Sequence, residues 1–243
     1  MDSKGKVALI TGAARIGQVV AQSLATLGCD LALVYRGSRE AAEGSAKAAI
    51  SAGVRAITIS ADATDKDQVA AAVKEAHSAL ARIDILVNMA AVYRSTPKPE
   101  QADWSNIMDA NARSVFLFST FAAPIMKQGA GGRIINFADW LPVSRRPRYP
   151  GFVPYYSSKA AVVALTESLA LELAPEILVN AIAPGPILAP PGLTPEDDNE
   201  VIKATPLRRW GGAAEIAKTV RFLIESDFIT GECIRVDGGR HLY

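Results

Sequence analysis

Short apolar segments alternate with longer segments of helical periodicity along the whole chain. The short segments are nearly all apolar, which is typical of strands that are buried on both faces of a sheet. We expect strands at Val7–Thr11, Asp30–Tyr35, Ala56–Ser60, Ile83–Asn88, Arg133–Phe137, Leu178–Ile182 and Cys233–Val236. The longer segments repeat apolar positions at the spacing of an amphipathic helix. We expect helices at Gly17–Leu27, Arg39–Ala52, Lys66–Leu80, Trp104–Met126, Tyr155–Leu173 and Ala213–Glu225.

This alternation of strands and helices predicts an α/β fold. The expected architecture is a single-domain Rossmann fold over residues 1–243, with a doubly wound, seven-stranded parallel sheet and helices on both faces. One long segment, Pro184–Leu207, is irregular and contains six prolines. Irregular loops of this length usually act as lids or binding loops, so we expect a substrate lid near residues 186–206. Thr194 and Pro195 are suited to begin a short helix within it.

Composition and charge narrow the functional classes. Of the 243 residues 49% are hydrophobic. The net charge is +1, and Lys and Arg are spread throughout the chain, so nucleic acid is not expected as a partner. The N-terminus lacks a signal-peptide pattern and no apolar stretch is long enough to cross a bilayer, which predicts a soluble, cytoplasmic protein. Cys29 and Cys233 fit neither a disulfide framework nor a metal motif, so no metal site is expected.

A tyrosine and a lysine four residues apart open the predicted helix Tyr155–Leu173. Side chains at this spacing lie on one helix face, so Tyr155 and Lys159 project side by side, whereas Tyr156 does not share their register. A nearby positive charge favours the phenolate and lowers the pKa of a phenol from its ordinary value of about 10. The pair is therefore a candidate general acid or base. The alternative is an exposed Tyr and Lys on a solvated face.

A glycine-rich turn, Gly12 to Gly17, follows the first predicted strand and opens the first predicted helix. Glycines at such a turn let backbone N–H groups approach a pyrophosphate, and the helix N-terminus favours its negative charge. Strand, turn and helix fall in the order that a dinucleotide-binding site requires.

Residues after the second and third strands indicate which dinucleotide is bound. An NAD site usually carries an acidic residue after the second strand, but this chain has Arg36 and Ser38, which suit the 2′-phosphate of NADP. The alternative for Arg36 is a solvated loop residue. Asp62, after the third strand, is placed to meet an adenine amino group, while Thr64 or Asp65 fits the N-cap of the next helix.

Together these residues resemble the short-chain dehydrogenase/reductase family. Further markers of the resemblance are Asn88-Met89-Ala90-Ala91, Asn111, Asn180, Pro184-Gly185 and Asp237-Gly238-Gly239. By resemblance, Tyr155 donates or accepts the proton, Lys159 binds the nicotinamide ribose and tunes Tyr155, and Asn111 holds a proton-relay water. The resemblance implies cofactor contacts from Gly12, Arg15, Ile16, Gly17, Tyr35, Arg36, Ser38, Asp62, Ala63, Asn88, Ala90, Tyr155, Lys159, Pro184, Gly185 and Ile187. It also implies a homotetramer built on the two helices Trp104–Met126 and Tyr155–Leu173 and on the C-terminal strand.

The chain departs from the family pattern at three points. The glycine turn is one residue short and lacks the middle glycine, Met89-Ala90-Ala91 replaces the commoner Asn-Ala-Gly, and Asp139 stands where a serine usually assists the tyrosine. The last two departures resemble the pteridine reductase branch, which carries an Asp at this point.

In that branch an aromatic residue after strand four stacks on the pterin, and Tyr93 falls there. The resemblance therefore implies substrate contacts from Arg15, Tyr93, Asp139 and Tyr155. A carboxylate at position 139 suits the ring N–H and amino donors of a pterin, since charge-assisted hydrogen bonds are strong. The alternative is that Asp139 only caps the following loop.

The favoured hypothesis is an NADPH-dependent reductase that transfers hydride to a C=N or C=O bond, with a pterin as substrate. One alternative is reduction of a 3-oxoacyl thioester or a small ketone, although that branch normally has serine in place of Asp139. The other alternative is an NADP-binding sensor that has lost catalysis, an idea that the short glycine turn supports and that intact Tyr155, Lys159 and Asn111 oppose.

Overall fold

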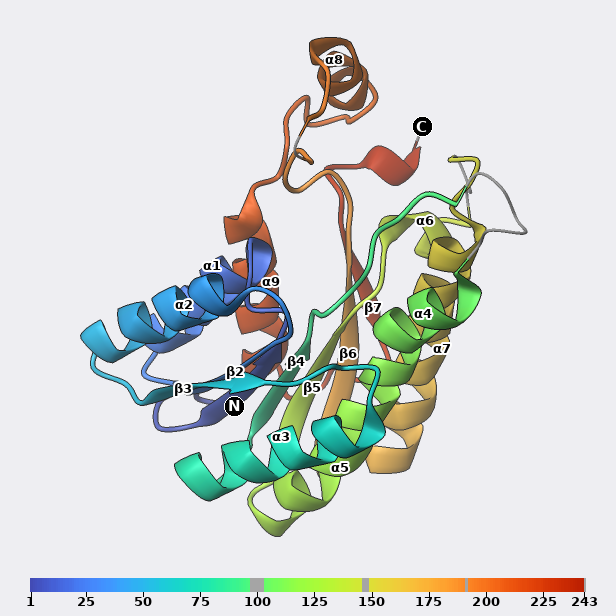
Figure 1. The fold of residues 1–243 in the computed structure, drawn as a ribbon. Coiled ribbons are helices and arrows are strands. Elements are labelled where there is room, and N and C mark those ends of the chain that lie inside the picture. The colour runs from blue at the N-terminus through green and yellow to red at the C-terminus, as the bar shows by residue number, and fades with distance from the viewer. Residues whose placement is uncertain (97–102, 146–148, 191, 243) are drawn as a thin grey trace.

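Seven strands form one parallel sheet in the computed structural model, which describes residues 1–96, 103–145, 149–190 and 192–242. The strands lie in the order β3-β2-β1-β4-β5-β6-β7 (Figure 1). Strand β1, the third in this order, pairs with β2 on one side and with β4 on the other, so the chain reverses its direction of winding there. The predicted doubly wound fold is confirmed. The strands are β1 (Val7–Thr11), β2 (Asp30–Tyr35), β3 (Ala56–Ser60), β4 (Ile85–Asn88), β5 (Gly132–Phe137), β6 (Ile177–Pro184) and β7 (Cys233–Val236).

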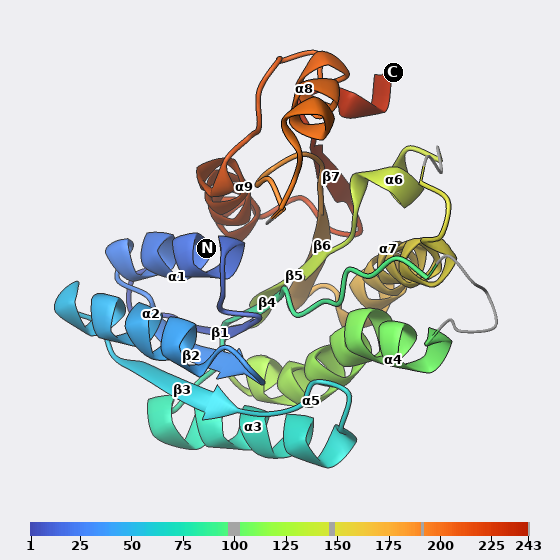
Figure 2. The same cartoon turned by 45° about the horizontal axis from the view of Figure 1, so that its top comes forward.

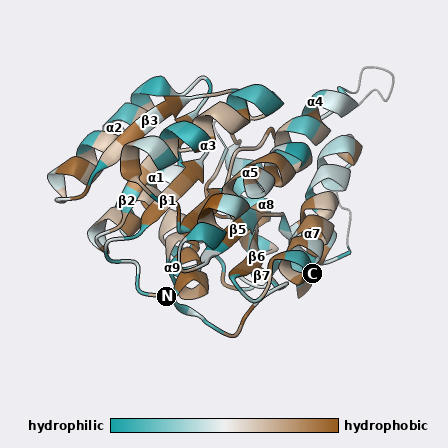
Figure 3. Ribbon diagram, turned by 90° about the horizontal axis from the view of Figure 1, so that it is seen from below, coloured by the Kyte–Doolittle hydropathy of each residue, from teal (hydrophilic) through white to brown (hydrophobic). Residues whose placement is uncertain are grey.

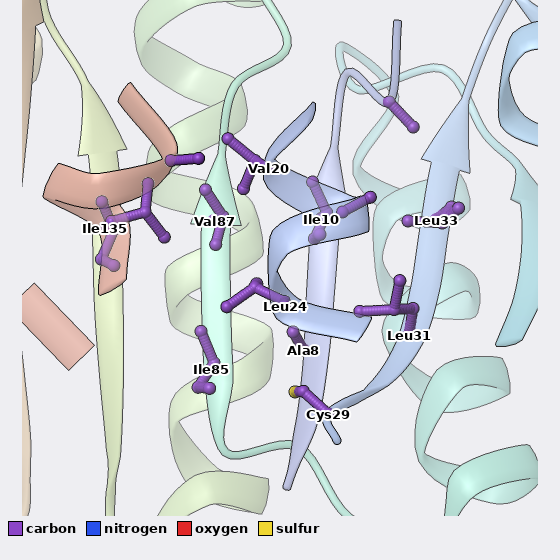
Figure 4. Close-up of a cluster of buried hydrophobic side chains, with 14 of the residues drawn as sticks. Ala8, Ile10, Val20, Leu24, Cys29, Leu31, Leu33, Ile85, Val87 and Ile135 are labelled. Atoms are coloured by element: carbon purple, nitrogen blue, oxygen red, sulfur yellow. The ribbon is translucent and has the colours of Figure 1, made fainter. Parts of the chain in front are cut away.

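Helices cover both faces of the sheet (Figures 1 and 2). One layer holds α1 (Ile16–Thr26), α2 (Arg39–Ser51) and α9 (Ala213–Glu225), and the other holds α3 (Lys66–Leu80), α5 (Ser114–Gln128) and α7 (Val153–Leu173). Successive side chains of a strand point to opposite faces. Ile10 accordingly packs in the core under α1, while Leu9 packs in the core under α3 and α5. Figure 4 shows the first of these cores, with Val20 and Leu24 of α1 lying over the strands.

The hydropathy pattern explains this arrangement. The strands are brown, and so hydrophobic, in Figure 3, and the helices carry teal patches. Burial of a large aliphatic side chain stabilises the fold by about 1.5–3 kcal/mol, so the two cores are the main source of stability. None of the helices in the described ranges is long and apolar enough to span a bilayer. Cys29 is buried and Cys233 half-buried, both as free thiols.

The predicted helix Trp104–Met126 is divided into three parts. A short helix α4 (Trp104–Met108) runs into one π-helical turn, η2 (Asp109–Arg113), which leads into α5. The side chain of Asn111 in that turn bonds the backbone of Val92 twice, accepting from its N–H at 2.6 Å and donating to its C=O at 3.0 Å. We infer that these two bonds stabilise the wider turn, a feature that often occurs at functional sites. A pattern of apolar residues does not reveal it.

A short helix, α8 (Pro195–Lys203), lies within the predicted lid, beyond the upper ends of the strands in Figures 1 and 2. It begins as predicted, because the Thr194 hydroxyl accepts a hydrogen bond from the N–H of Asp197 at 3.1 Å. Position 191 of the lid lies outside the described residues. Two shorter elements near the same end of the sheet, α6 (Trp140–Val143) and the 3₁₀ turn η3 (Arg240–Leu242), were not predicted.

Candidate active site

One cavity of about 830 Å³ opens among the loops that follow the strands. This is the edge of a doubly wound sheet at which ligands bind. Its wall brings together most of the residues predicted to contact the cofactor: Gly12, Arg15, Ile16, Gly17, Tyr35, Arg36, Ser38, Asp62, Ala63, Ala90, Tyr155, Pro184, Gly185 and Ile187. The substrate candidates Tyr93 and Asp139 line it as well. Three predicted site residues, Asn88, Asn111 and Lys159, are buried and do not line the cavity.

Two glycines shape the turn after β1. A Cβ atom at Gly12 would lie 2.8 Å from the backbone N of Ala90, and one at Gly17 would lie 2.2 Å from the carbonyl O of Gly12. Both contacts are with backbone that cannot rotate away, so each position requires glycine. The tight turn brings the N-terminus of α1 to the cavity, where its N–H groups can bind a pyrophosphate. The shortened turn therefore keeps the shape that a dinucleotide needs.

Arg15 has a backbone conformation that normally requires glycine, and it lies in the turn that lacks the family's middle glycine. Its φ of 52° and ψ of −108° lie in a region that side-chain-bearing residues rarely adopt. Such a conformation costs on the order of 1–3 kcal/mol. The guanidinium of Arg15 donates to the carbonyl O of Ala189 at 3.1 Å, so this residue connects the glycine turn to the start of the lid.

A comparison of Arg15→Gly with Arg15→Ala should reveal this strain. Both substitutions remove the guanidinium, but only glycine relaxes the backbone. We expect Arg15→Gly to have a free energy of unfolding about 1 kcal/mol higher than Arg15→Ala, in spite of the entropic cost of glycine. Urea denaturation measures the difference. Equal stability of the two variants would show that the turn is not strained at this position.

Charged side chains line the cavity beside the loops that follow β2 and β3. Arg36 pairs with Asp62, with 3.3 Å between its Nη1 and a carboxylate oxygen, and 59% of its side chain is exposed. Asp62 also accepts from the N–H and the hydroxyl of Thr64, and the hydrogen bond from that N–H is the main reason why its pKa is lowered. Ser38 occupies the N-cap of α2 without a side-chain hydrogen bond to that helix. Arg36 and Ser38 line this part of the cavity, and Asp65 caps the next helix, α3, by accepting from the N–H groups of Asp67 and Gln68.

The pair on α7 is buried, so the alternative of a solvated face is excluded. Tyr155 is 6% and Lys159 is 4% exposed. The hydroxyl of Tyr155 donates to Oδ2 of Asp139 at 2.8 Å, and Nζ of Lys159 donates to the carbonyl O of Phe137 at 2.7 Å. Tyr155 therefore faces the cavity, whereas Lys159 does not line it.

The prediction that Lys159 lowers the pKa of Tyr155 is wrong for this arrangement. Burial raises the pKa of Tyr155 well above its ordinary value, and the charge and hydrogen bond of Asp139 raise it further. Burial also lowers the pKa of Lys159 to about 8, against the opposing charge of Asp139. The physical reason is that the nearest charged group to the phenol is a carboxylate, while the ammonium is directed at a backbone carbonyl.

Asp139 caps the following loop, which was the alternative considered for it, and it also binds Tyr155. Its Oδ1 accepts from the N–H of Leu141 at 2.9 Å and so caps α6, while its Oδ2 accepts from Tyr155. Burial raises the pKa of this carboxyl above its usual range, although the hydrogen bonds and the charge of Lys159 act in the opposite direction. A carboxyl with a raised pKa beside a phenol can share a proton with it.

The buried amide side chains of Asn111 and Asn88 form hydrogen bonds next to the residues that line the cavity. Besides its bonds to Val92, Asn111 donates to the hydroxyl of Ser158 at 3.0 Å, directly before Lys159 in the chain. Asn88 donates to Asn136 at 2.9 Å. In this arrangement both predicted residues bind other parts of the protein, which fixes the ends of β4 and β5 and the register of α7.

Comparisons with known proteins agree with this geometry. A family model described as enoyl-(acyl carrier protein) reductase matches residues 12–241. The 3-oxoacyl-[acyl-carrier-protein] reductase FabG of Staphylococcus aureus is 37% identical over 245 residues, covering 98% of this chain and 98% of that protein. A solved short-chain dehydrogenase/reductase from Serratia marcescens superimposes with a TM-score of 0.91 at 33% identity, covering 99% of this chain and 100% of the other. The chain is a short-chain dehydrogenase/reductase.

Another solved structure extends the comparison within the short-chain dehydrogenase/reductase family. The NADPH-dependent 3-quinuclidinone reductase from Rhodotorula rubra has a TM-score of 0.90 at 28% identity and covers 100% of this chain and 93% of the other. The family prediction is confirmed. The names of these relatives refer to oxoacyl and ketone reduction, and they give no support to the pteridine reductase branch.

In this short-chain dehydrogenase/reductase, aromatic rings gather beside Tyr155. The ring of Tyr93 lies edge-on to that of Tyr155 at 4.8 Å between centroids and stacks on Phe152 at 4.9 Å. Tyr149 and Trp140 line the cavity too. Tyr93 was predicted at the site, but its partner Phe152 was not, because a phenylalanine next to a helix start has no distinguishing signal.

Two further cavity residues were missed. Trp210 reaches the cavity from the segment after α8, and its indole N–H donates to Asp198 at 2.7 Å. Arg240 reaches it from the C-terminal turn. The signal for Arg240 was present, since it is a cation directly after the family marker Asp237-Gly238-Gly239.

Proposed function

We propose that this chain is an NADPH-dependent reductase of carbonyl compounds, with a 3-oxoacyl thioester or a small ketone as substrate. The observation that carries the proposal is the buried hydroxyl of Tyr155 at the cavity wall, hydrogen-bonded to Asp139. The 37% identity to a 3-oxoacyl-[acyl-carrier-protein] reductase over nearly the whole chain supports this alternative over the pterin that the sequence favoured.

The dinucleotide site is suited to NADP. The glycine turn admits a pyrophosphate, and Arg36 with Ser38 offers a cation and a hydroxyl to a 2′-phosphate. A structure with bound NADPH, the blue fluorescent protein from a metagenomic library, has a TM-score of 0.91 at 32% identity and covers 99% of each chain. NADPH would supply the hydride when bound there.

The residues of the chain then handle the proton. Because its pKa is raised, Tyr155 stays protonated at neutral pH and can donate to the oxygen of a carbonyl as that oxygen becomes an alkoxide. Asp139 orients the hydroxyl and can return a proton to it. Lys159 holds the carbonyl of Phe137 next to that site.

A substrate panel tests the proposal. Purified protein is mixed with NADPH and, in separate wells, an acetoacetyl thioester, small ketones or a dihydropterin, and absorbance follows cofactor oxidation. We expect turnover of the thioester or the ketones. Binding of NADPH without turnover of any compound would contradict the proposal and favour the sensor alternative.

A pterin is retained as the second candidate on one specific observation. The carboxylate of Asp139 lines the cavity 2.8 Å from the Tyr155 hydroxyl, where it can accept from a pterin N–H, and Tyr93 offers a ring beside it. Preferential oxidation of NADPH by the dihydropterin in the same panel would favour this candidate.

Replacement of Arg36 tests the choice of dinucleotide. We expect Arg36→Leu to raise the KM for NADPH about 10- to 100-fold, because a hydrogen bond to a charged group contributes about 1.5–3 kcal/mol. The KM for NADH should change far less, since NADH lacks the 2′-phosphate. Arg221→Leu is the matched control, because Arg221 is an exposed arginine on α9 that pairs with Glu225. A parallel rise for both cofactors would reject the role of Arg36.

We also propose that the chain forms a homotetramer, as the family resemblance implies. Exposed apolar side chains on the helices expected at the interface, Phe116 on α5 and Leu171 on α7, support the proposal. Light scattering coupled to size-exclusion chromatography measures the assembled mass, and a monomeric mass would contradict it.

A further inference from the structure

A buried arginine lines the substrate end of the cavity. Arg240 is 5% exposed, and its Nη1 is buried without a hydrogen-bond partner. Among the residues that the structure describes, no carboxylate forms an ion pair with it. Buried arginines nearly always have a partner, because removing a charge from water is costly unless hydrogen bonds replace the water.

The position of Arg240 identifies the part of the ligand that it would contact. Its guanidinium carbon lies 5.9 Å from the ring centroid of Trp140, which directly follows Asp139. The turn η3 that carries it lies near α6 in Figures 1 and 2. The phosphate-binding residues of the dinucleotide site, Gly12 and Arg36, belong to the loops after β1 and β2. Arg240 therefore faces the substrate and not the cofactor phosphates.

The C-terminal turn holds Arg240 in place. The carboxylate of Asp237 accepts from the N–H of Gly239 at 3.0 Å, and its other oxygen lies 2.7 Å from the ring Nδ1 of His241. The N–H of Arg240 donates to the carbonyl O of Asp237 at 3.0 Å. The ring of Trp140 stabilises the cation from one side, but it does not satisfy the in-plane N–H donors of a guanidinium.

Other charges in the cavity do not neutralise Arg240. Asp139 forms no ion pair with Arg240, and its two oxygens accept from Tyr155 and Leu141. Asp197 and Glu200 of α8 line the cavity from exposed positions, where solvent and salt screen their charges. The guanidinium remains available to a planar anion, and a carboxylate fits its two parallel N–H groups best.

We propose that Arg240 binds a carboxylate of the substrate, so that the preferred ketone is an oxo acid. This inference rests on the proposed carbonyl reductase function and narrows its substrate class. The carbonyl would lie at the Tyr155 hydroxyl and the carboxylate at Arg240, with the carbon chain spanning the cavity between them. A neutral ketone or ester fills the same cavity without an anion for the guanidinium.

The test compares 2-, 3- and 4-oxo acids with their methyl esters, using NADPH oxidation as readout. At the chain length that spans the two groups, we expect the acid to have a kcat/KM at least about tenfold above its ester. Arg240→Met should lower that acid-to-ester ratio about 10- to 100-fold, mainly through KM, because a hydrogen-bonded charge is lost. Arg240→Lys keeps the charge without the planar fork and should restore part of the ratio.

Controls separate this proposal from its alternatives. Arg235→Met removes an exposed arginine on β7 and should leave the ratio unchanged. If the acid-to-ester ratio of kcat/KM is unchanged in Arg240→Met, the proposal is overturned. If Arg240→Met instead changes the mass of the assembled protein and leaves that ratio unchanged, the proposal is also overturned, because Arg240 then binds an anionic group of a neighbouring chain. If no carbonyl compound is reduced, the proposed function fails, but calorimetry of oxo acids with the NADP⁺-loaded protein still tests the carboxylate site. Binding that is lost in Arg240→Met supports the site. Absence of binding to the unaltered chain overturns it.

Discussion

Tyr155→Phe should lower kcat about 100- to 10,000-fold on the substrate that the panel identifies, while the Kd for NADPH changes less than about threefold. The substitution removes the hydroxyl that donates to Asp139 at the cavity wall and keeps the ring that packs against Tyr93. Proton donation is lost, whereas the walls of the dinucleotide site, formed mainly by other elements, stay in place. Stopped-flow absorbance gives the rate, and quenching of intrinsic fluorescence gives the affinity.

Tyr156→Phe is the matched control for this experiment. Tyr156 is the next residue of α7, is half-buried and does not line the cavity. Its loss of a hydroxyl should leave kcat unchanged within experimental error. If both variants behaved alike, or if Tyr155→Phe kept full turnover, Tyr155 would not be the proton donor.

Gly17→Ala should weaken NADPH binding about 10- to 100-fold and lower the free energy of unfolding by about 1–3 kcal/mol. The added Cβ atom would lie 2.2 Å from the carbonyl O of Gly12, so the turn has to open. An open turn moves the N–H groups of the α1 N-terminus away from the pyrophosphate. Equilibrium titration with NADPH and urea denaturation measure the two effects.

Gly44→Ala is the matched control for Gly17→Ala in the same helix layer, and we expect the opposite change in stability. Gly44 lies within α2, and a Cβ atom there would meet no atom within 4 Å. Alanine should raise the free energy of unfolding by about 0.5–1 kcal/mol, because it restricts the unfolded chain and favours the helix. NADPH affinity should not change. Equal effects of the two substitutions would show that the close contact at Gly17 does not limit the turn.

The fold was predictable because its main signals are periodic. Apolar strands such as Val7–Thr11 and helices such as Lys66–Leu80 have the same bounds in the sequence prediction and in the structure. The π-helical turn at Asn111 was not predictable, because two hydrogen bonds to Val92, distant in sequence, accompany it. The short turns α6 and η3 have too few residues for any period.

Most residues of the site could be predicted from the sequence, but the pKa shifts of those residues could not. Motif positions placed Tyr155, Asp139 and Arg36 at one cavity, and the structure brings them to its wall. The direction of the Tyr155 pKa shift could not be predicted, since it depends on burial and on which neighbour the hydroxyl meets. Arg240 was missed because its place after Asp237-Gly238-Gly239 does not show that its side chain is buried, with no partner for Nη1 among the described residues.

The hydrogen bond from Arg15 to Ala189 joins two parts of the molecule that would otherwise respond to their ligands separately. If the Arg15 guanidinium must release the Ala189 carbonyl before the lid can move away from the cavity, the free energy of breaking this hydrogen bond contributes both to release of the product and to binding of the dinucleotide. Linkage of this kind is reciprocal, so whatever tightens one equilibrium changes the other by the same factor. We therefore expect replacement of this single side chain, on a backbone conformation normally left to glycine, to change how strongly each ligand affects the affinity for the other.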